Sequence, residues 1–275
     1  MDTGYRKTEY AAAGFWLTHT VGMDAGQSTI NHPHINADRM LLYFIHGSGN
    51  VMMGEKSYRI QAGDMILTHP TQLYHCAIDS NMFHERIVVH IDQTFFQQFP
   101  CDISRLQNRQ SCYIGGSTVA GSGLTNRITE LLDLVQQDSL NSNILAVCKL
   151  TELLVQLDEI TERADREVVQ RNHLIDRVLA YLNENFADAI SVDTVAAHFH
   201  ITSSYLSHLF KDHTGLPLWN YVILRRLQLV NSLMRQGLSA EDACYRAGFE
   251  NYANFYRLYK KHLGMTPSQY KKQAQ

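Results

Sequence analysis

Two stretches of the chain have the same pattern and decide its fold: residues 191–215, SVDTVAAHFHITSSYLSHLFKDHTG, and residues 247–270, AGFENYANFYRLYKKHLGMTPSQY. In the first, Ser191 predicts the N-cap of a short helix, and a second helix follows after a tight turn and ends at Gly215. In the second, Gly248 predicts the turn between another pair of short helices. A short helix, a tight turn and a second short helix form a helix-turn-helix, and the chain is predicted to contain two.

The residues around these stretches extend the helical pattern. A longer helix is predicted over 217–236, because Ile223, Leu227 and Val230 recur at helical spacing. Another helix precedes the first stretch and ends around Asn185. The last part of the chain is therefore predicted to be helical throughout.

The second helix of each predicted unit suits the major groove of DNA, which requires small or polar side chains toward the bases and an apolar opposite face. Asn and Arg make paired hydrogen bonds to adenine and guanine, and Lys suits backbone phosphates. One such polar side chain could equally belong to a solvated face, but two faces on paired units favour DNA. The predicted DNA-binding residues are Ser203, Ser204, Ser207, His208, Lys211, Ala253, Asn254, Arg257, Lys260 and Lys261.

Charge is distributed unevenly along the 275 residues. Residues 171–275 contain 12 Lys and Arg against 8 Asp and Glu, whereas residues 1–170 contain 12 against 19. A basic segment beside an acidic one is typical of nucleic-acid binding, because neutralising phosphates releases condensed counterions. Ordinary variation in surface charge could give the same asymmetry.

The two quoted stretches resemble the paired DNA-binding units of the AraC/XylS transcription regulators. In the second stretch, Gly-Phe, an aromatic-Arg pair, Lys-Lys and a final Gly-x-Thr-Pro-Ser-Gln-Tyr occur in the family's order. The resemblance implies two helices in successive major-groove segments on one side of the duplex. The first helix departs from the family, since Ser207 and His208 stand where many relatives have a longer donor followed by Arg. We therefore expect Arg257 and Asn254 of the second helix to provide at least as much base discrimination.

The first hundred residues are predicted to form short strands separated by turns, which is typical of an antiparallel sandwich or barrel. The predicted strands are residues 11–17, 39–46, 52–60 with a turn at Gly54, 65–68 and 84–91. Apolar spacing then predicts amphipathic helices at 124–135 and 144–157, packed on the barrel or on a second copy. The charged stretch 158–170 is predicted to be a linker or a solvated helix.

This half resembles the cupin-like effector domain of many AraC/XylS regulators, in residues 41–49, 58–70, 74–75 and 85–91. The resemblance implies a two-domain α+β protein, with a cupin-like antiparallel β-barrel and flanking helices followed by an all-α double helix-turn-helix. We expect an effector-binding and dimerisation domain at residues 1–160 and a DNA-binding domain at residues 171–275.

Cupins that bind metal use two His and a carboxylate from one motif and a further His from the next. His32, His34 and Asp38 imitate the first motif. In the second, Tyr74 occupies the His position and His75 comes one residue late, which on a strand turns a side chain to the opposite face. A metal-dependent enzyme is therefore disfavoured, and we expect no metal, cofactor or catalytic residue.

A pocket without metal fits the barrel better, because small polar ligands are held by aromatic stacking and a few hydrogen-bonding groups. From strand position and from the ligand-binding members of the family, the residues expected to line the barrel and bind the effector are His34, Arg39, Tyr43, Tyr74 and Glu85. Each could instead be a satisfied or exposed polar residue. Family members with this arrangement often respond to mono- or oligosaccharides.

The expected protein is a homodimeric, sequence-specific transcription regulator, an activator by resemblance. Its expected partners are double-stranded DNA, a small effector such as a sugar, and RNA polymerase. Two alternatives remain: a metal-dependent cupin enzyme fused to a DNA-binding domain, and a constitutive dimeric DNA-binding protein whose barrel only dimerises.

The chain is expected to act in the cytoplasm, away from a membrane. Its longest apolar run, residues 40–45, is far shorter than the roughly 18 residues of a membrane-spanning helix. The apolar residues 11–17 are interpreted as a strand and not as a signal peptide. Five cysteines, an odd number without a C-x-x-C pair, indicate reduced thiols.

Overall fold

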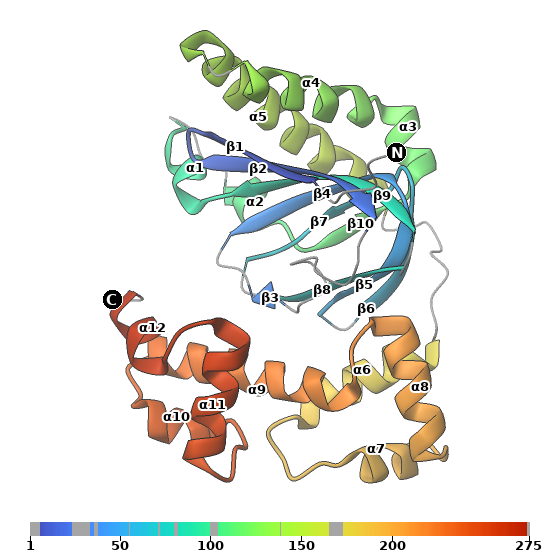
Figure 1. Cartoon of the computed structure of the whole chain (residues 1–275), viewed down its shortest axis with the longest axis vertical. Coiled ribbons are helices and arrows are strands. Elements are labelled where there is room, and N and C mark those ends of the chain that lie inside the picture. The colour runs from blue at the N-terminus through green and yellow to red at the C-terminus, as the bar shows by residue number, and fades with distance from the viewer. Residues whose placement is uncertain are drawn as a thin grey trace.

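The computed structural model describes residues 6–23, 34–35, 38–54, 56–70, 72–79, 82–99, 104–137, 139–164 and 173–273. A β-rich domain lies above a helical domain, and two antiparallel helices cover the top of the β-rich domain (Figure 1). The predicted two-domain α+β architecture is confirmed.

Two antiparallel sheets face each other in the first domain. Sheet A has the order β1 (Arg6–Ala12), β2 (Phe15–Met23), β9 (Phe83–Ile91), β4 (Arg39–His46), β7 (Met65–Leu67) and β10 (Cys112–Ile114). Sheet B has the order β3 (His34–Ile35), β8 (Leu73–Ile78), β5 (Ser48–Met53) and β6 (Lys56–Gln61). Strands adjacent in each sheet are antiparallel, as the barrel prediction requires.

The predicted strands at 39–46, 52–60 and 84–91 are confirmed as β4, the β5–β6 hairpin and β9. The single strand predicted at 11–17 is wrong, because the chain reverses there between β1 and β2. Gly14 makes the reversal with φ +75°, and a Cβ at this position would lie 2.8 Å from the Cα of Phe95.

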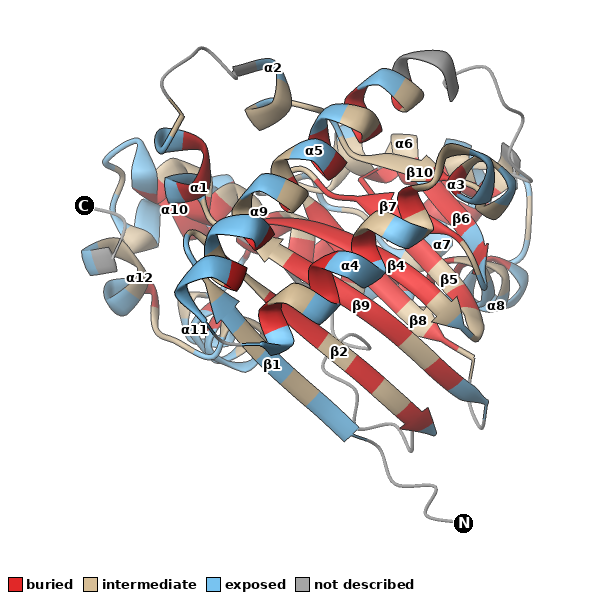
Figure 2. Ribbon diagram, turned by 90° about the horizontal axis from the view of Figure 1, so that it is seen from above, coloured by how far each residue is buried: buried red, intermediate tan, exposed pale blue. Residues whose placement is uncertain are grey.

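Side chains alternate between the two faces of sheet A. Leu41 and Ile87 point to the face covered by α4 (Leu124–Gln136) and α5 (Leu140–Ala164), where they share a core with both helices (Figure 2). Leu42 and Val88 point the other way, into a second core between the sheets. Both faces of β4 and β9 are therefore buried.

Helix α5 runs on to Ala164, so the first part of the stretch predicted to be a linker or a solvated helix, residues 158–164, is the end of this helix. The rest of that stretch lies outside the described residues. Asp158 is only 7% exposed, and its carboxylate forms ion pairs with Arg105 Nε at 2.7 Å and with Arg109 Nη1 at 3.2 Å. The helix is therefore packed and not solvated at Asp158. The charge of this buried carboxylate is neutralised by the two arginines.

The helical domain has two helix-turn-helix units joined by one long helix. Its helices are α6 (His173–Asn185), α7 (Val192–His198), α8 (Ser203–Thr214), α9 (Leu218–Arg235), α10 (Ala240–Arg246), α11 (Tyr252–Leu263) and α12 (Pro267–Gln273). Ser191 is the N-cap of α7, as predicted from the sequence, and Asn251 is the N-cap of α11. Each unit has its own core, and α9 contributes to both.

Within the described ranges, no helix is both long and apolar enough to cross a membrane. The four cysteines in these ranges, Cys76, Cys112, Cys148 and Cys244, are free thiols.

Candidate nucleic-acid interface

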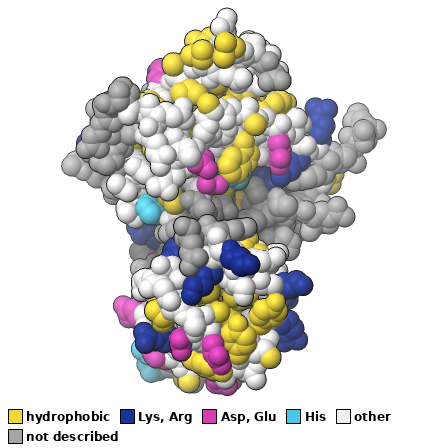
Figure 3. Space-filling view, turned by 90° about the vertical axis from the view of Figure 1, so that its left-hand side faces the viewer, with side chains coloured by type: hydrophobic (Ala, Val, Ile, Leu, Met, Phe, Trp, Pro, Cys, Tyr) yellow, Lys and Arg dark blue, Asp and Glu magenta, His cyan; other side chains and the backbone are white. Residues whose placement is uncertain are grey.

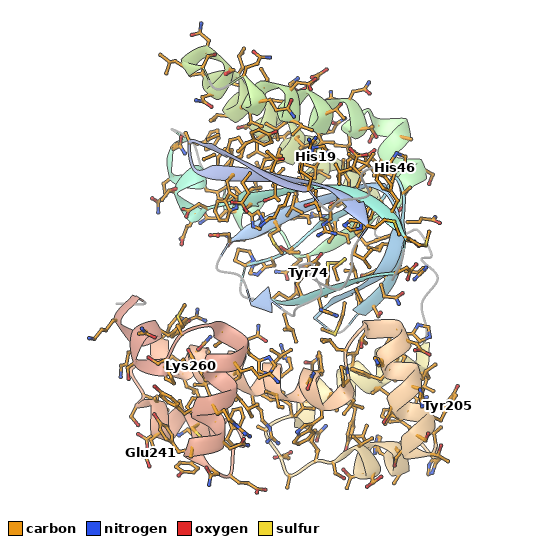
Figure 4. All side chains as sticks on the ribbon, in the orientation of Figure 1. His19, His46, Tyr74, Tyr205, Glu241 and Lys260 are labelled. Carbon is orange, nitrogen blue, oxygen red and sulfur yellow. The ribbon has the colours of Figure 1, made fainter. Side chains whose placement is uncertain are left out.

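Helices α8 and α11 lie at opposite ends of the helical domain, with Tyr205 on the first and Lys260 on the second (Figure 4). The fully buried side chains of Leu206 and Phe210 fix α8, and those of Phe255 and Tyr259 fix α11. Nine of the ten predicted DNA-binding residues are exposed, and the tenth, Ser203, is half-buried. The structure therefore presents both predicted polar faces at the surface.

On α11, two of the predicted base-reading side chains are in contact. Arg257 Nη2 donates a hydrogen bond to Asn254 Oδ1 at 3.0 Å. The backbone N–H of Asn254 in turn donates to Oδ1 of the N-cap, Asn251, at 3.0 Å. The two groups that suit guanine and adenine are thus held together at the exposed N-terminal half of the helix.

On α8, Ser203 has a different role from its neighbours. Its hydroxyl donates a hydrogen bond to Asp193 Oδ1 in the first turn of α7. This bond ties the two helices of the unit together and leaves Ser204, Ser207 and His208 exposed for contact with DNA.

Exposed tyrosines on both helices were not predicted as DNA-binding residues. Tyr205 follows Ser204 on α8, and Tyr256 precedes Arg257 on α11. Each stands next to a polar residue that was predicted, and an exposed aromatic side chain beside such a residue is the signal that could have identified them. Their hydroxyls can donate to phosphate oxygens.

Arg226 of α9 joins the two units. Its Nε donates to Phe186 O at 2.7 Å and its Nη2 donates to Asp188 O at 2.9 Å, while the guanidinium lies over the rings of Trp219 and Phe249. Burial lowers the pKa of Arg226, and the nearby carboxylate of Glu250 opposes this effect. Because one buried side chain contacts the ends of α6 and α10, it fixes the orientation of one unit relative to the other.

Lysine and arginine side chains are spread over the helical domain on the side that carries α10–α12, with acidic side chains toward its lower edge (Figure 3). The last turn of α11 is basic, with Lys260, Lys261 and His262. Positive charge there is suited to backbone phosphates and also stabilises the negative end of the helix dipole.

In the barrel, the predicted effector residues fall into two groups. Tyr74 points into the core between the sheets, where burial raises its pKa (Figure 4). His34 lies in β3 opposite Tyr74 in the register, and its side chain is outside the described part of the structure.

Arg39, Tyr43 and Glu85 do not line the barrel, which corrects their predicted placement. Arg39 Nη2 donates to Gln107 O and Arg109 O, each at 2.7 Å, and burial lowers the pKa of its guanidinium to about 10. Tyr43 shares the core under the helices and donates to Thr125 Oγ1 of α4 at 3.4 Å.

Glu85 is on the same face of sheet A, where Oε1 is 2.9 Å from His19 Nε2. Arg39, Tyr43 and Glu85 are each separated by an even number of residues from Leu41 or Ile87 on the same strand, so they lie on the same face of the sheet. That face packs under α4 and α5. A side chain on that face points away from the barrel interior, because successive residues of a strand point to opposite faces.

The interior face of sheet A has polar residues that were not among those predicted from the sequence. Trp16 and His90 are paired in the register and their rings stack at 4.6 Å, and Thr20 is opposite Arg86. Arg86 is 1% exposed and interacts electrostatically with Tyr74 and Cys76 of sheet B. The alternation of His84, Arg86, Val88 and His90 along β9 is the pattern that could have identified this face.

Within the described ranges, no group of three His, Cys, Asp or Glu is arranged to hold a metal ion. His75 lies on the outer face of sheet B, near Gly215 of the helical domain and opposite in phase to Tyr74. His32 lies outside the described residues. Asp38 is described, and its pKa is raised by burial and by the carboxylate of Asp92.

Comparisons with known proteins agree with this geometry. Residues 18–154 match the family model of an AraC-like ligand binding domain, and residues 195–273 match that of a helix-turn-helix domain. The uncharacterized HTH-type transcriptional regulator YdiP of Escherichia coli is 24% identical over 248 residues, which are 88% of this chain and 81% of that protein.

Two further relatives match over a shorter length. The melibiose operon regulatory protein of Escherichia coli is 28% identical over 118 residues, 42% of this chain and 39% of that protein. The HTH-type transcriptional activator AarP of Providencia stuartii is 26% identical over 102 residues, 37% of this chain and 76% of that protein. Among solved structures, ToxT from Vibrio cholerae is 13% identical with a TM-score of 0.39, over 98% of this chain and 97% of that one.

Proposed function

The chain belongs to the AraC family of DNA-binding transcription regulators, with an N-terminal ligand-binding domain, and from that premise we propose that α8 and α11 are its two DNA-reading helices. The observation that carries this proposal is the exposed Arg257–Asn254 pair at the N-terminal half of α11. Two helices that present polar faces from one domain suit two successive major-groove segments.

The two helices contribute differently. Helix α11 offers Arg and Asn, which discriminate bases by paired hydrogen bonds. Helix α8 offers Ser207 and His208, whose shorter side chains make single hydrogen bonds to a base. Lys211, Lys260 and Lys261 contact phosphates and set the register of the protein on the duplex. Base discrimination therefore resides mainly in the segment read by α11.

The effector is a small polar molecule, a sugar or oligosaccharide, bound between the two sheets of the barrel. The stacked Trp16 and His90 offer an aromatic surface, and Thr20, Tyr74 and Arg86 have hydrogen-bonding groups on the sheet faces that point toward each other. The named role of the melibiose operon regulatory protein supports a saccharide as the class to test first.

Two copies associate through α5. Three large apolar side chains are exposed within one and a half turns of this helix, Leu140 at 77%, Ile144 at 55% and Leu145 at 54%. A contiguous apolar patch on a helix otherwise packed on its own domain suits an identical patch on a second copy. The dimer then places two DNA-binding domains on one operator, where an activator contacts RNA polymerase.

Two measurements test the proposal. Selection of bound duplexes from a random pool should give two blocks of preferred bases, and Arg257→Ala should remove the preference in one of them. Thermal unfolding against a saccharide panel should show a higher transition temperature with one sugar, because a ligand of the native state stabilises it. No shift with any sugar would contradict the saccharide class and favour a barrel that only dimerises, without affecting the DNA assignment.

A further inference from the structure

The two helix-turn-helix units differ in their surroundings. Helix α8 of the first unit packs against β5, β6 and β8, on the outer face of sheet B, whereas the main contacts of α11 are with α9, α10 and α12 (Figure 1). Met52 and Leu73 of sheet B share one apolar core with Phe210 and Tyr221 of the first unit. The barrel therefore contacts one reading helix directly and is linked to the other through α9.

The glycines that end the two reading helices show the same difference. Gly215 and Gly264 both follow the last turn in the left-handed region, with φ +74° and +69°, and both donate back to a lysine carbonyl. A Cβ on Gly215 would overlap Cβ of Ala77 and lie 2.9 Å from His75 Nε2, whereas no atom in the described part of the chain lies within 4 Å of the same position on Gly264. The end of α8 is thus fitted to sheet B at van der Waals contact.

Two polar side chains of sheet B complete the last turn of α8. The final carbonyls of a helix have no partner within it and must be satisfied from outside. Asn50 Nδ2 of β5 donates to Asp212 O at 2.5 Å, and Ser57 Oγ of β6 donates to His213 O. The preceding carbonyl, that of Lys211, accepts from the N–H of Gly215 at 2.8 Å.

We propose that Asn50 and Ser57 are positioning residues for DNA reading: the barrel supplies the C-cap of the first reading helix and so sets the order of its last turn. Lys211, one of the predicted phosphate contacts, lies in that turn. This inference rests on the proposed role of α8 in DNA binding and adds a role for the ligand-binding domain within it.

The same two strands connect the cap to the effector space. Val51 and Tyr58, the chain neighbours of Asn50 and Ser57, point into the barrel core that also contains Tyr74. A ligand that moves β5 or β6 from the inside therefore moves the cap on the outside, because neighbouring strand residues are rigidly linked on opposite faces. The barrel can thus change how well ordered the last turn of α8 is without altering α11.

The experiment uses the full chain with the double change Asn50→Ala, Ser57→Ala. Amide exchange should speed up at residues 211–215 by roughly fivefold for each cap bond lost. In selection from a random duplex pool, base preference should fall in the block that Ser207→Ala with His208→Ala identifies as read by α8. The block identified by Arg257→Ala should keep its preference.

Two variants separate positioning from a general loss of stability. Gln61→Ala changes an exposed residue at the far end of β6 and should leave both exchange and preference unchanged. Ser57→Thr keeps the hydroxyl and, combined with native Asn50, should restore both.

The proposal is overturned if exchange at 211–215 is unchanged, if it rises while the α8 block keeps its preference, or if both blocks weaken equally. If neither the α8 change nor Arg257→Ala identifies a block, the DNA assignment itself fails and the positioning role with it. Faster amide exchange at residues 211–215 would then show that Asn50 and Ser57 only stabilise the end of the helix.

Discussion

The guanidinium of Arg257 donates to the amide oxygen of Asn254, three residues earlier on α11, with Nη2 and Oδ1 3.0 Å apart. Both side chains are exposed, so the bond contributes little to the stability of the fold. Its effect is on geometry, because it holds Arg257 in a restricted orientation and uses one of the two acceptor positions on the oxygen of Asn254. The other acceptor position and the NH₂ group of Asn254 stay available for a paired contact to a base. A pair arranged in this way before DNA arrives loses less side-chain entropy on binding.

Replacing Arg257 by Ala should lower discrimination at one base position by about 1–3 kcal/mol, because a paired contact to a base is lost. Binding to random duplex should change much less. Competition binding on the selected operator and on duplexes changed at single positions measures the difference. An equal loss on specific and random duplex would show that Arg257 contacts phosphate instead.

Replacing Lys260 by Ala should weaken binding to all sequences alike. The side chain is exposed in the last turn of α11, away from the base-reading end, so its expected contact is a phosphate. The slope of log affinity against log salt should become shallower by roughly one unit, as expected for one released counterion. A change of base preference with an unaltered slope would assign Lys260 to base reading.

The helix-turn-helix units were predictable because their signals are local. Ser191, Asn251 and the glycines after α8 and α11 fix helix ends within a few residues, whatever the rest of the chain does. The docking of α8 was not predictable in this way. Asn50 and Asp212 meet only because two separately formed domains come together.

The barrel lining was mispredicted for a different physical reason. A strand with one solvated face reveals its inner face by alternation of apolar and polar residues. In β4, six successive residues from Arg39 to Phe44 are buried, since one face packs on α4 and α5 and the other on sheet B. The pattern therefore contains no information on which face Arg39 and Tyr43 occupy.

Changing each of the two helix-ending glycines to Ala separates backbone strain from domain docking. Gly264→Ala should destabilise by about 1 kcal/mol, the cost of a side chain in the left-handed region. Gly215→Ala should cost about 1–3 kcal/mol more, because its Cβ also overlaps Ala77 across the domain contact. Denaturant unfolding followed by circular dichroism compares them, and equal losses would show that the domain contact yields without cost.

Replacing Ile144 and Leu145 by Lys should convert the proposed dimer to a monomer. Both side chains are more than half exposed on α5, so the change places two charges in the proposed interface without entering the core of the domain. Sedimentation velocity measures the mass, and circular dichroism should show unchanged helix content. The control, Asn126→Lys with Thr129→Lys, adds the same charge to exposed positions of α4 and should remain dimeric.

If the α5 variant keeps the dimer mass, the copies associate elsewhere and the exposed patch serves another partner. If the native chain is already a monomer at micromolar concentration, the patch is not a self-association surface in the free protein. A monomeric variant should still bind a single selected site, because α8 and α11 belong to one chain, but it should lose the tighter binding to two adjacent sites that linkage of two domains provides. That pattern connects the apolar residues of α5 to occupancy of the operator, since α5 lies on the opposite side of the β-rich domain from α8 and α11 (Figure 1).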